Sequence, residues 1–165
     1  MDRGRCDQHP RRQVLWRQAK ALSDSTRNVE RLSPRARSRL TVENDDRLFT
    51  PADLLPVSRA TGIPLVYDVH HHRCNADGRP EEESTQSAIA TWNREPMFHI
   101  SSPAGGWEGP SPKRHGDFLD VEDFPSFWLD LDVTVEVEAK AKEAAVLKLM
   151  KDLKRRRSSK AGRRL

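Results

Sequence analysis

Side chains suited to metal binding recur near the ends of four apolar segments of the chain. They are Glu43 at the end of the first, Asp68 and His71 after the second, His99 within the third, and Glu138 near the end of the fourth. Mixed carboxylate and imidazole ligands suit Mn²⁺, Zn²⁺ or Fe²⁺ better than Ca²⁺ or a thiolate-bound ion. If these ligands converge, they would hold two or more ions, and clustered ions hydrolyse phosphate esters by activating water and neutralising charge.

Each of these residues also has a simpler interpretation when taken alone. Glu43, in the string ENDD, is compatible with a solvated strand end, and His99 with a satisfied core histidine. The string DVHHH is more specific, because packing alone hardly explains an Asp followed three residues later by a His at a strand exit. In that string we expect His71 to be the ligand, and His70 and His72 to support it or face solvent. The hypothesis therefore depends on the joint pattern.

The elements that must position these residues alternate between strand and helix. We expect a barrel site at the carboxyl ends of parallel strands, where the following loops open. Pro51 at a helix start, capped by Thr50, and a stop at Gly62 define the clearest helix. The patterns predict strands at 39–44, 63–69, 97–101 and 133–139, and helices at 19–32, 51–61, 83–93 and 140–155, with loops at 73–82 and 102–117.

This order predicts an α/β fold with a parallel sheet of about four βα units. Four units are half of an eight-stranded barrel, and a complete TIM-type barrel usually needs roughly 250 residues, whereas this chain has 165. We therefore expect a partial (β/α) barrel over residues 19–155, with disordered basic segments at 1–18 and 156–165. The loop 102–117 exceeds the usual structural connection, so it is a candidate functional loop.

Composition restricts the class of protein. Hydrophobic residues make up 35% of the chain and charged residues 33%, with a mean hydropathy of −0.82, so part of the chain is expected to be unpacked. The net charge of +4 and the isoelectric point near 9.3 favour an anionic partner. No apolar run approaches the length of a membrane span. Cys6 and Cys74 match no zinc or redox spacing, so we expect reduced thiols and a cytoplasmic protein.

Several strings, taken in order, resemble the UV-damage DNA endonuclease family. They are NVERLSPRARSRLTVENDD, DLLPVSRATGIPLVYDVHHHR, SPKRHGDFLD and VEVEAKAKEAAVLKL, within residues 20–150. The resemblance implies the C-terminal half of a TIM-type barrel that incises UV-damaged double-stranded DNA on the 5′ side of photoproducts. It also implies several divalent ions, commonly Mn²⁺. Carried over by residue, it implies metal ligands at Glu43, Asp68, His71, His99 and Glu138, a metal or phosphate contact at His115 with a catalytic role, a catalytic or phosphate contact at Lys113, and a DNA contact at Arg114.

Two departures from the family pattern leave alternatives open. The family commonly has a lysine two residues before the strand histidine, where it can be carbamylated, but this chain has Met97. The first half of the barrel has no counterpart, and residues 1–18 do not resemble it. The chain is therefore interpreted as an active enzyme, a truncated form with reduced or no activity, or an inactive DNA-associated remnant. It could also pair with a separate first half or a second copy. A metal-dependent sugar isomerase or epimerase on the same barrel is a further alternative, which the basic loop residues disfavour.

Overall fold

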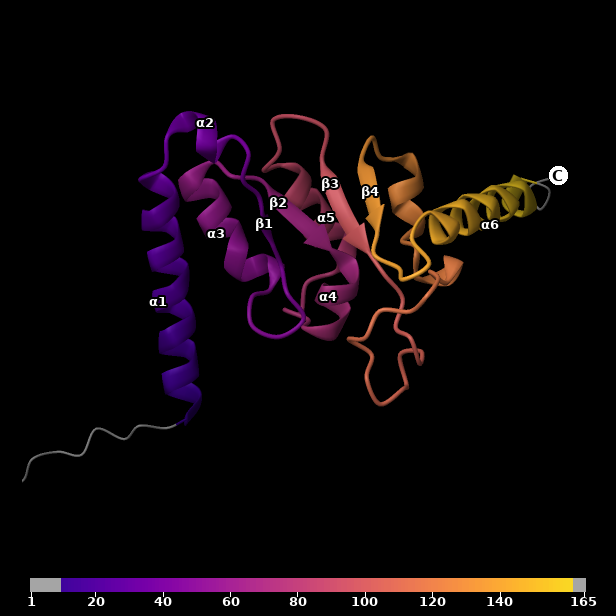
Figure 1. Ribbon diagram of the computed structural model, residues 1–165, viewed down its shortest axis with the longest axis horizontal. Coiled ribbons are helices and arrows are strands. Elements are labelled where there is room, and N and C mark those ends of the chain that lie inside the picture. The colour runs from indigo at the N-terminus through magenta and orange to yellow at the C-terminus, as the bar shows by residue number, and fades with distance from the viewer. Residues whose placement is uncertain (1–9, 162–165) are drawn as a thin grey trace, which may run out of the picture.

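A four-stranded parallel sheet forms the centre of the molecule in the computed structural model, which describes residues 10–161 (Figure 1). The strands lie in the order β1-β2-β3-β4, so each pairs with the next along the chain. The predicted partial α/β architecture is confirmed. The elements are β1 (Val42–Glu43), β2 (Leu65–Asp68), β3 (Met97–Ile100), β4 (Thr134–Val137), α1 (Pro10–Glu30), α2 (Pro34–Arg37), α3 (Pro51–Thr61), α4 (Val69–Cys74), α5 (Glu81–Ile89), α6 (Glu143–Ala161), η1 (Val121–Asp123) and η2 (Ser126–Asp130).

The register of the strands divides the sheet into two chemically different faces. Successive side chains of a strand point to opposite faces, and directly paired residues share a face. Glu43 pairs with Val66, Asp68 with His99, and His99 with Glu136, so the ionisable residues share one face. The opposite face is apolar and forms the core, with side chains from Leu65, Tyr67, Phe98, Ile100, Val135 and Val137.

Helices α3 and α5 cover the apolar face of the sheet. Leu54 and Leu55 from α3 and Ala88 from α5 are buried in the same cluster as the strand residues. Helix α3 begins with a capping box between Thr50 and Asp53 and ends at Gly62, whose φ of 73° favours glycine. The predicted start and stop of this helix are confirmed.

Both terminal segments are more helical than the sequence indicated. Helix α1 begins at Pro10 and α6 continues to Ala161, so the predicted disorder is wrong for residues 10–18 and 156–161. Proline is suited to a first helical turn, and the Arg, Lys and Gln residues that follow are good helix formers. Tertiary contacts also hold these turns: Gln18 donates to Asp53 at 3.3 Å, and Arg156 donates to the carbonyl of Val121 at 2.9 Å. Residues 1–9 and 162–165, with Cys6 among them, lie outside the described part.

Two further elements differ from the sequence prediction. Residues 69–74 form the short helix α4, where a loop was expected from 73, and β1 has two residues instead of the predicted six. Six residues are too few for a helical period to show in the sequence. The carboxylate of Asp68 caps α4 by accepting a hydrogen bond of 2.8 Å from the backbone of His71. A buried acidic residue thus ends the strand and begins the helix.

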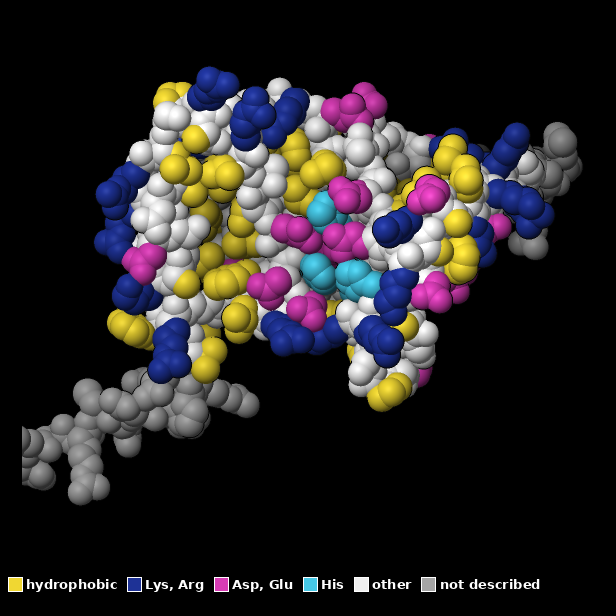
Figure 2. All heavy atoms as spheres, in the orientation of Figure 1, with side chains coloured by type: hydrophobic (Ala, Val, Ile, Leu, Met, Phe, Trp, Pro, Cys, Tyr) yellow, Lys and Arg dark blue, Asp and Glu magenta, His cyan; other side chains and the backbone are white. Residues whose placement is uncertain are grey.

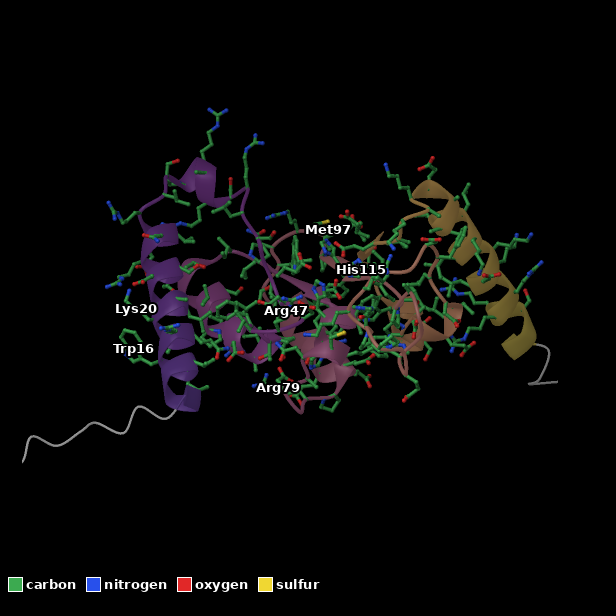
Figure 3. All side chains as sticks on the ribbon, turned by 60° about the horizontal axis from the view of Figure 1, so that its bottom comes forward. Trp16, Lys20, Arg47, Arg79, Met97 and His115 are labelled. Atoms are coloured by element: carbon green, nitrogen blue, oxygen red, sulfur yellow. The ribbon has the colours of Figure 1, made fainter. Side chains whose placement is uncertain are left out.

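Large apolar side chains remain exposed on the two outer helices. Trp16 projects from α1, away from the sheet, as Figure 3 shows, and its neighbours Val14 and Leu15 are also exposed. On α6, Leu147 and Met150 are exposed. Neither these helices nor any other within residues 10–161 has the length and apolar character to span a membrane.

Candidate metal centre

The polar face of the sheet gathers histidine and carboxylate side chains near the carboxyl ends of the strands (Figure 2). Two groups place their ligand atoms within 4.8 Å of one another. Glu138 belongs to both groups, so its carboxylate could contribute to either one. The first group is Glu43, Asp68, His99 and Glu138; the second is His71, His115 and Glu138. The two groups contain the five residues that the sequence analysis selected as metal ligands, and they add His115, for which the resemblance implied a metal or phosphate contact.

The first group surrounds the ring of His99. Its Nδ1 lies 3.3 Å from Oε1 of Glu43 and 3.3 Å from Oε1 of Glu138. Asp68 is fully buried, and its Oδ2 has no hydrogen-bond partner, as is also true of both ring nitrogens of His99. Buried polar atoms without partners are costly. Three carboxylates and an imidazole fit a divalent cation that would satisfy them.

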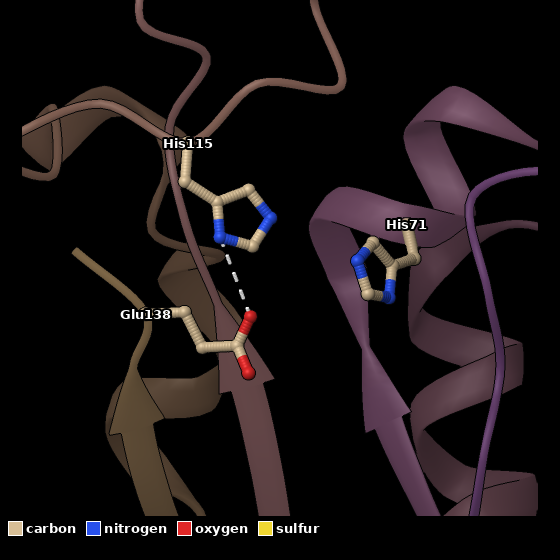
Figure 4. A group of neighbouring side chains, drawn as sticks. All are labelled: His71, His115 and Glu138. Carbon is tan, nitrogen blue, oxygen red and sulfur yellow. Dashed lines mark ion pairs between the residues drawn. The ribbon is translucent and has the colours of Figure 1, made fainter. Parts of the chain in front are cut away.

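The second group joins α4 to the loop 102–117. Nδ1 of His115 lies 3.4 Å from Oε2 of Glu138, and His71 faces this pair from α4 (Figure 4). His71 donates a hydrogen bond of 3.0 Å from Nδ1 to the carbonyl of Asn44. Because a carbonyl only accepts, the neutral ring carries its proton on Nδ1 and leaves Nε2 for an ion.

The charges of the cluster compensate one another. Burial opposes ionisation of Glu43, but hydrogen bonds and charges from His71 and His99 outweigh it and lower its pKa to about 2. Burial likewise opposes the charged form of both histidines. The surrounding carboxylates nevertheless raise the pKa of His71 to about 9 and that of His99 to about 10. Protons on the two rings therefore supply the positive charge that cations would otherwise bring.

Asn44 positions the site although the sequence analysis did not select it. It is fully buried, and its amide donates to the carbonyl of Asp68 at 2.8 Å and accepts from the backbone N–H of Asp68 at 3.0 Å. The side chain thereby continues the pairing of β1 with β2 where the backbone ladder ends. The only signal in the sequence was its place directly after Glu43.

A second set of unpredicted residues holds the loop that carries His115. Trp107 donates from Nε1 to Asp123 at 2.7 Å, and Asp123 also accepts from Ser102. His70 is buried, with its ring centroid 5.1 Å from that of Trp107 and 5.1 Å from that of His115. A tryptophan within a Gly/Pro-rich loop was the available signal.

The two flanking histidines of DVHHH are both buried, so the solvent-facing alternative is wrong for each. His72 bonds Tyr67 at 2.7 Å through Nδ1 and Asp77 at 3.1 Å through Nε2. It fixes the loop after α4 and does not belong to either ligand group. His70 and His72 are buried because residues 69–74 form helix α4, which directs both side chains towards the protein interior.

Other predicted site residues lie around the ligands. Lys113 bonds the backbone carbonyl of Asp46 and lies 3.6 Å from its carboxylate, so it is a partnered residue outside both ligand groups. Arg114 is exposed. Met97 lies on the polar face of β3, two residues before His99, in the middle of the molecule (Figure 3).

Comparisons with known proteins establish the family of this chain. Residues 16–162 match the family model described as UV-endonuclease UvdE. The chain belongs to this family. It is 42% identical over 127 residues to the UV DNA damage endonuclease of Deinococcus radiodurans, 34% over 125 residues to that of Halalkalibacterium halodurans, and 30% over 142 residues to that of Bacillus cereus, which is 72%, 70% and 81% of this chain.

The UvdE relatives are longer than this chain. The matches cover 40%, 38% and 44% of these three proteins, so the chain spans about two fifths of their length. The fold also matches a crystal structure of SacUVDE with a TM-score of 0.74 and 30% identity, over 84% of this chain and 47% of that chain. The match confirms the partial UvdE-type fold.

Proposed function

We propose that this chain supplies the metal-binding half of a UV-damage DNA endonuclease, which hydrolyses a phosphodiester bond on the 5′ side of UV photoproducts. The observation that carries the proposal is the pair of ligand groups sharing Glu138. Membership of the UvdE family supports DNA as the substrate. The mixed oxygen and nitrogen ligands suit Mn²⁺, Zn²⁺ or Fe²⁺, and among these ions the resemblance to the family implies Mn²⁺.

Each group of residues has a part in the proposed reaction. Divalent ions supply Lewis-acid activation of water and charge neutralisation at the phosphate when bound. Glu43, Asp68 and His99 would hold one ion, His71 and His115 would hold a second, and Glu138 belongs to both groups. Lys113 and Arg114 lie on the same loop as His115, where they would contact the DNA backbone. Lys113 would then exchange its bond with Asp46 for a phosphate.

The test is a nicking assay on UV-irradiated and unirradiated supercoiled plasmid, with Mn²⁺ and with chelator, using monodisperse protein. The expected result is nicking that requires both damage and Mn²⁺, and that Glu43→Ala and His71→Ala abolish. Arg79→Ala is a suitable control, because Arg79 is exposed and lies outside both ligand groups. Cutting at wild-type level by either ligand variant would refute the site assignment.

A second arm of the same assay tests whether another chain must complete the sheet at its unpaired edges. Among the described residues, β1 and β4 each pair with only one strand. The chain is therefore assayed alone, with its oligomeric state measured, and mixed with the first half of the D. radiodurans relative. Nicking only in the mixture would assign activity to a two-part barrel. Metal binding without nicking in either arm would favour a remnant, and a sugar isomerase assay would then test the remaining alternative.

A further inference from the structure

Glu136 is an ionisable residue of the polar face that belongs to neither ligand group. It is the direct partner of His99 in the register of β3 and β4, and both side chains point to the same face. Its Oε2 lies 3.6 Å from Nε2 of His99, whereas Glu43 and Glu138 face Nδ1. Its side chain is 59% exposed, so it has room to move.

The two nitrogens of His99 have different surroundings. Nδ1 faces Glu43 and Glu138, each 3.3 Å away, which are members of the first ligand group. Nε2 lies 3.6 Å from Oε2 of Glu136 and, like Nδ1, is buried without a hydrogen-bond partner. Met97, two residues earlier on the same face, offers only a thioether, which is a weak acceptor. The nearest carboxylate on the Nε2 side is therefore Glu136.

We propose that Glu136 is a positioning residue, which accepts a hydrogen bond from Nε2–H of His99 and so presents Nδ1 to the metal ion. This inference depends on the proposed metal centre. The proposal requires a small rotation of the exposed Glu136 side chain, which would bring its oxygen from 3.6 Å to hydrogen-bonding distance of Nε2. A carboxylate on the far nitrogen of a ligating imidazole fixes the ring orientation and increases its basicity. Glu136 acts through His99 and is not itself a ligand.

The first measurement is the Zn²⁺ affinity of the purified full chain, by calorimetry with a competing chelator. Glu136→Leu removes the acceptor and is expected to weaken Zn²⁺ binding about 10- to 100-fold. Glu136→Gln retains an acceptor oxygen without the charge, so its loss of Zn²⁺ affinity should be smaller than that of Glu136→Leu. Glu83→Gln is the matched control, because its side chain is similarly exposed, at 57%, but lies on α5. It should leave the affinity unchanged.

Two further readouts separate positioning from a general structural effect. Long-range ¹H–¹⁵N NMR of the Zn²⁺-bound protein should show His99 coordinated through Nδ1 with its proton on Nε2. In a His99→Ala background, Glu136→Leu should cause no further loss of affinity. Circular dichroism verifies that each metal-free variant folds. If Glu136→Leu does not fold, the Zn²⁺ affinity of Glu136→Gln tests the proposal instead.

The inference is overturned by any of three results. They are an unchanged affinity in a folded Glu136 variant, coordination of His99 through Nε2 in the wild-type protein, and a full Glu136→Leu effect without His99. A nicking assay on the same samples keeps the two proposals apart. Normal Zn²⁺ binding with the expected Glu136 effect, but no nicking, would refute only the proposed endonuclease function.

Discussion

Replacement of Asn44 by alanine should destabilise both the sheet and the metal centre. Asn44 is fully buried, and its amide makes hydrogen bonds of 2.8 Å and 3.0 Å to the two backbone groups of Asp68. Asn44→Ala leaves one buried N–H and one buried C=O unpaired, and each costs about 1–3 kcal/mol. We therefore expect a loss of about 2–6 kcal/mol in the free energy of unfolding. At about 2–4 °C per kcal/mol for a chain of this size, the melting temperature should fall by about 4–24 °C.

The assay is urea and thermal unfolding of the metal-free protein, followed by circular dichroism. Asn93→Ala is the control, because Asn93 is exposed and its side-chain oxygen accepts a hydrogen bond from the neighbouring Arg94. Zn²⁺ affinity should also fall in Asn44→Ala, since Asp68 loses the support of β1. A change below about 0.5 kcal/mol would refute the reasoning, because that is the range of ordinary surface substitutions.

Three further predictions concern the cluster itself. Stability of the metal-free protein should be greatest between pH 4.5 and 6.5. Because the pKa values of His71 and His99 are raised, the stability that they contribute is lost as pH rises through about 9 and 10. Because the pKa of Glu43 is lowered, the stability that it contributes is lost as pH falls through about 2. A pH series of urea midpoints measures this, and a flat profile would contradict it. Mn²⁺ at 100 times its dissociation constant should stabilise the fold by about 2.7 kcal/mol, and chelator should reverse the shift in melting temperature. Met97→Lys should raise nicking by a fusion with a complete first half, whereas no change would show that Met97 is accommodated.

Local sequence signals predicted most of the helices and strands but not the contacts between them. The strings MFHIS and VTVEVEA were correctly predicted to be strands, and Thr50 with Gly62 correctly bounded α3. The short helix α4 was missed, because the same carboxylate of Asp68 both ends β2 and caps the helix. The extension of α6 was missed because its last turns depend on a tertiary contact from Arg156 to Val121.

The sequence by itself determined which residue types could bind metal and where along each strand they fall. The strand register of the folded sheet then placed these residues on one face and the apolar residues on the other. Only the tertiary structure decided that Glu138 serves both ligand groups, that Asn44 completes the ladder beside Asp68, and that Glu136 faces Nε2 of His99. These relations join different strands, and the parallel register that creates them is set by packing across the whole sheet, which no single segment encodes.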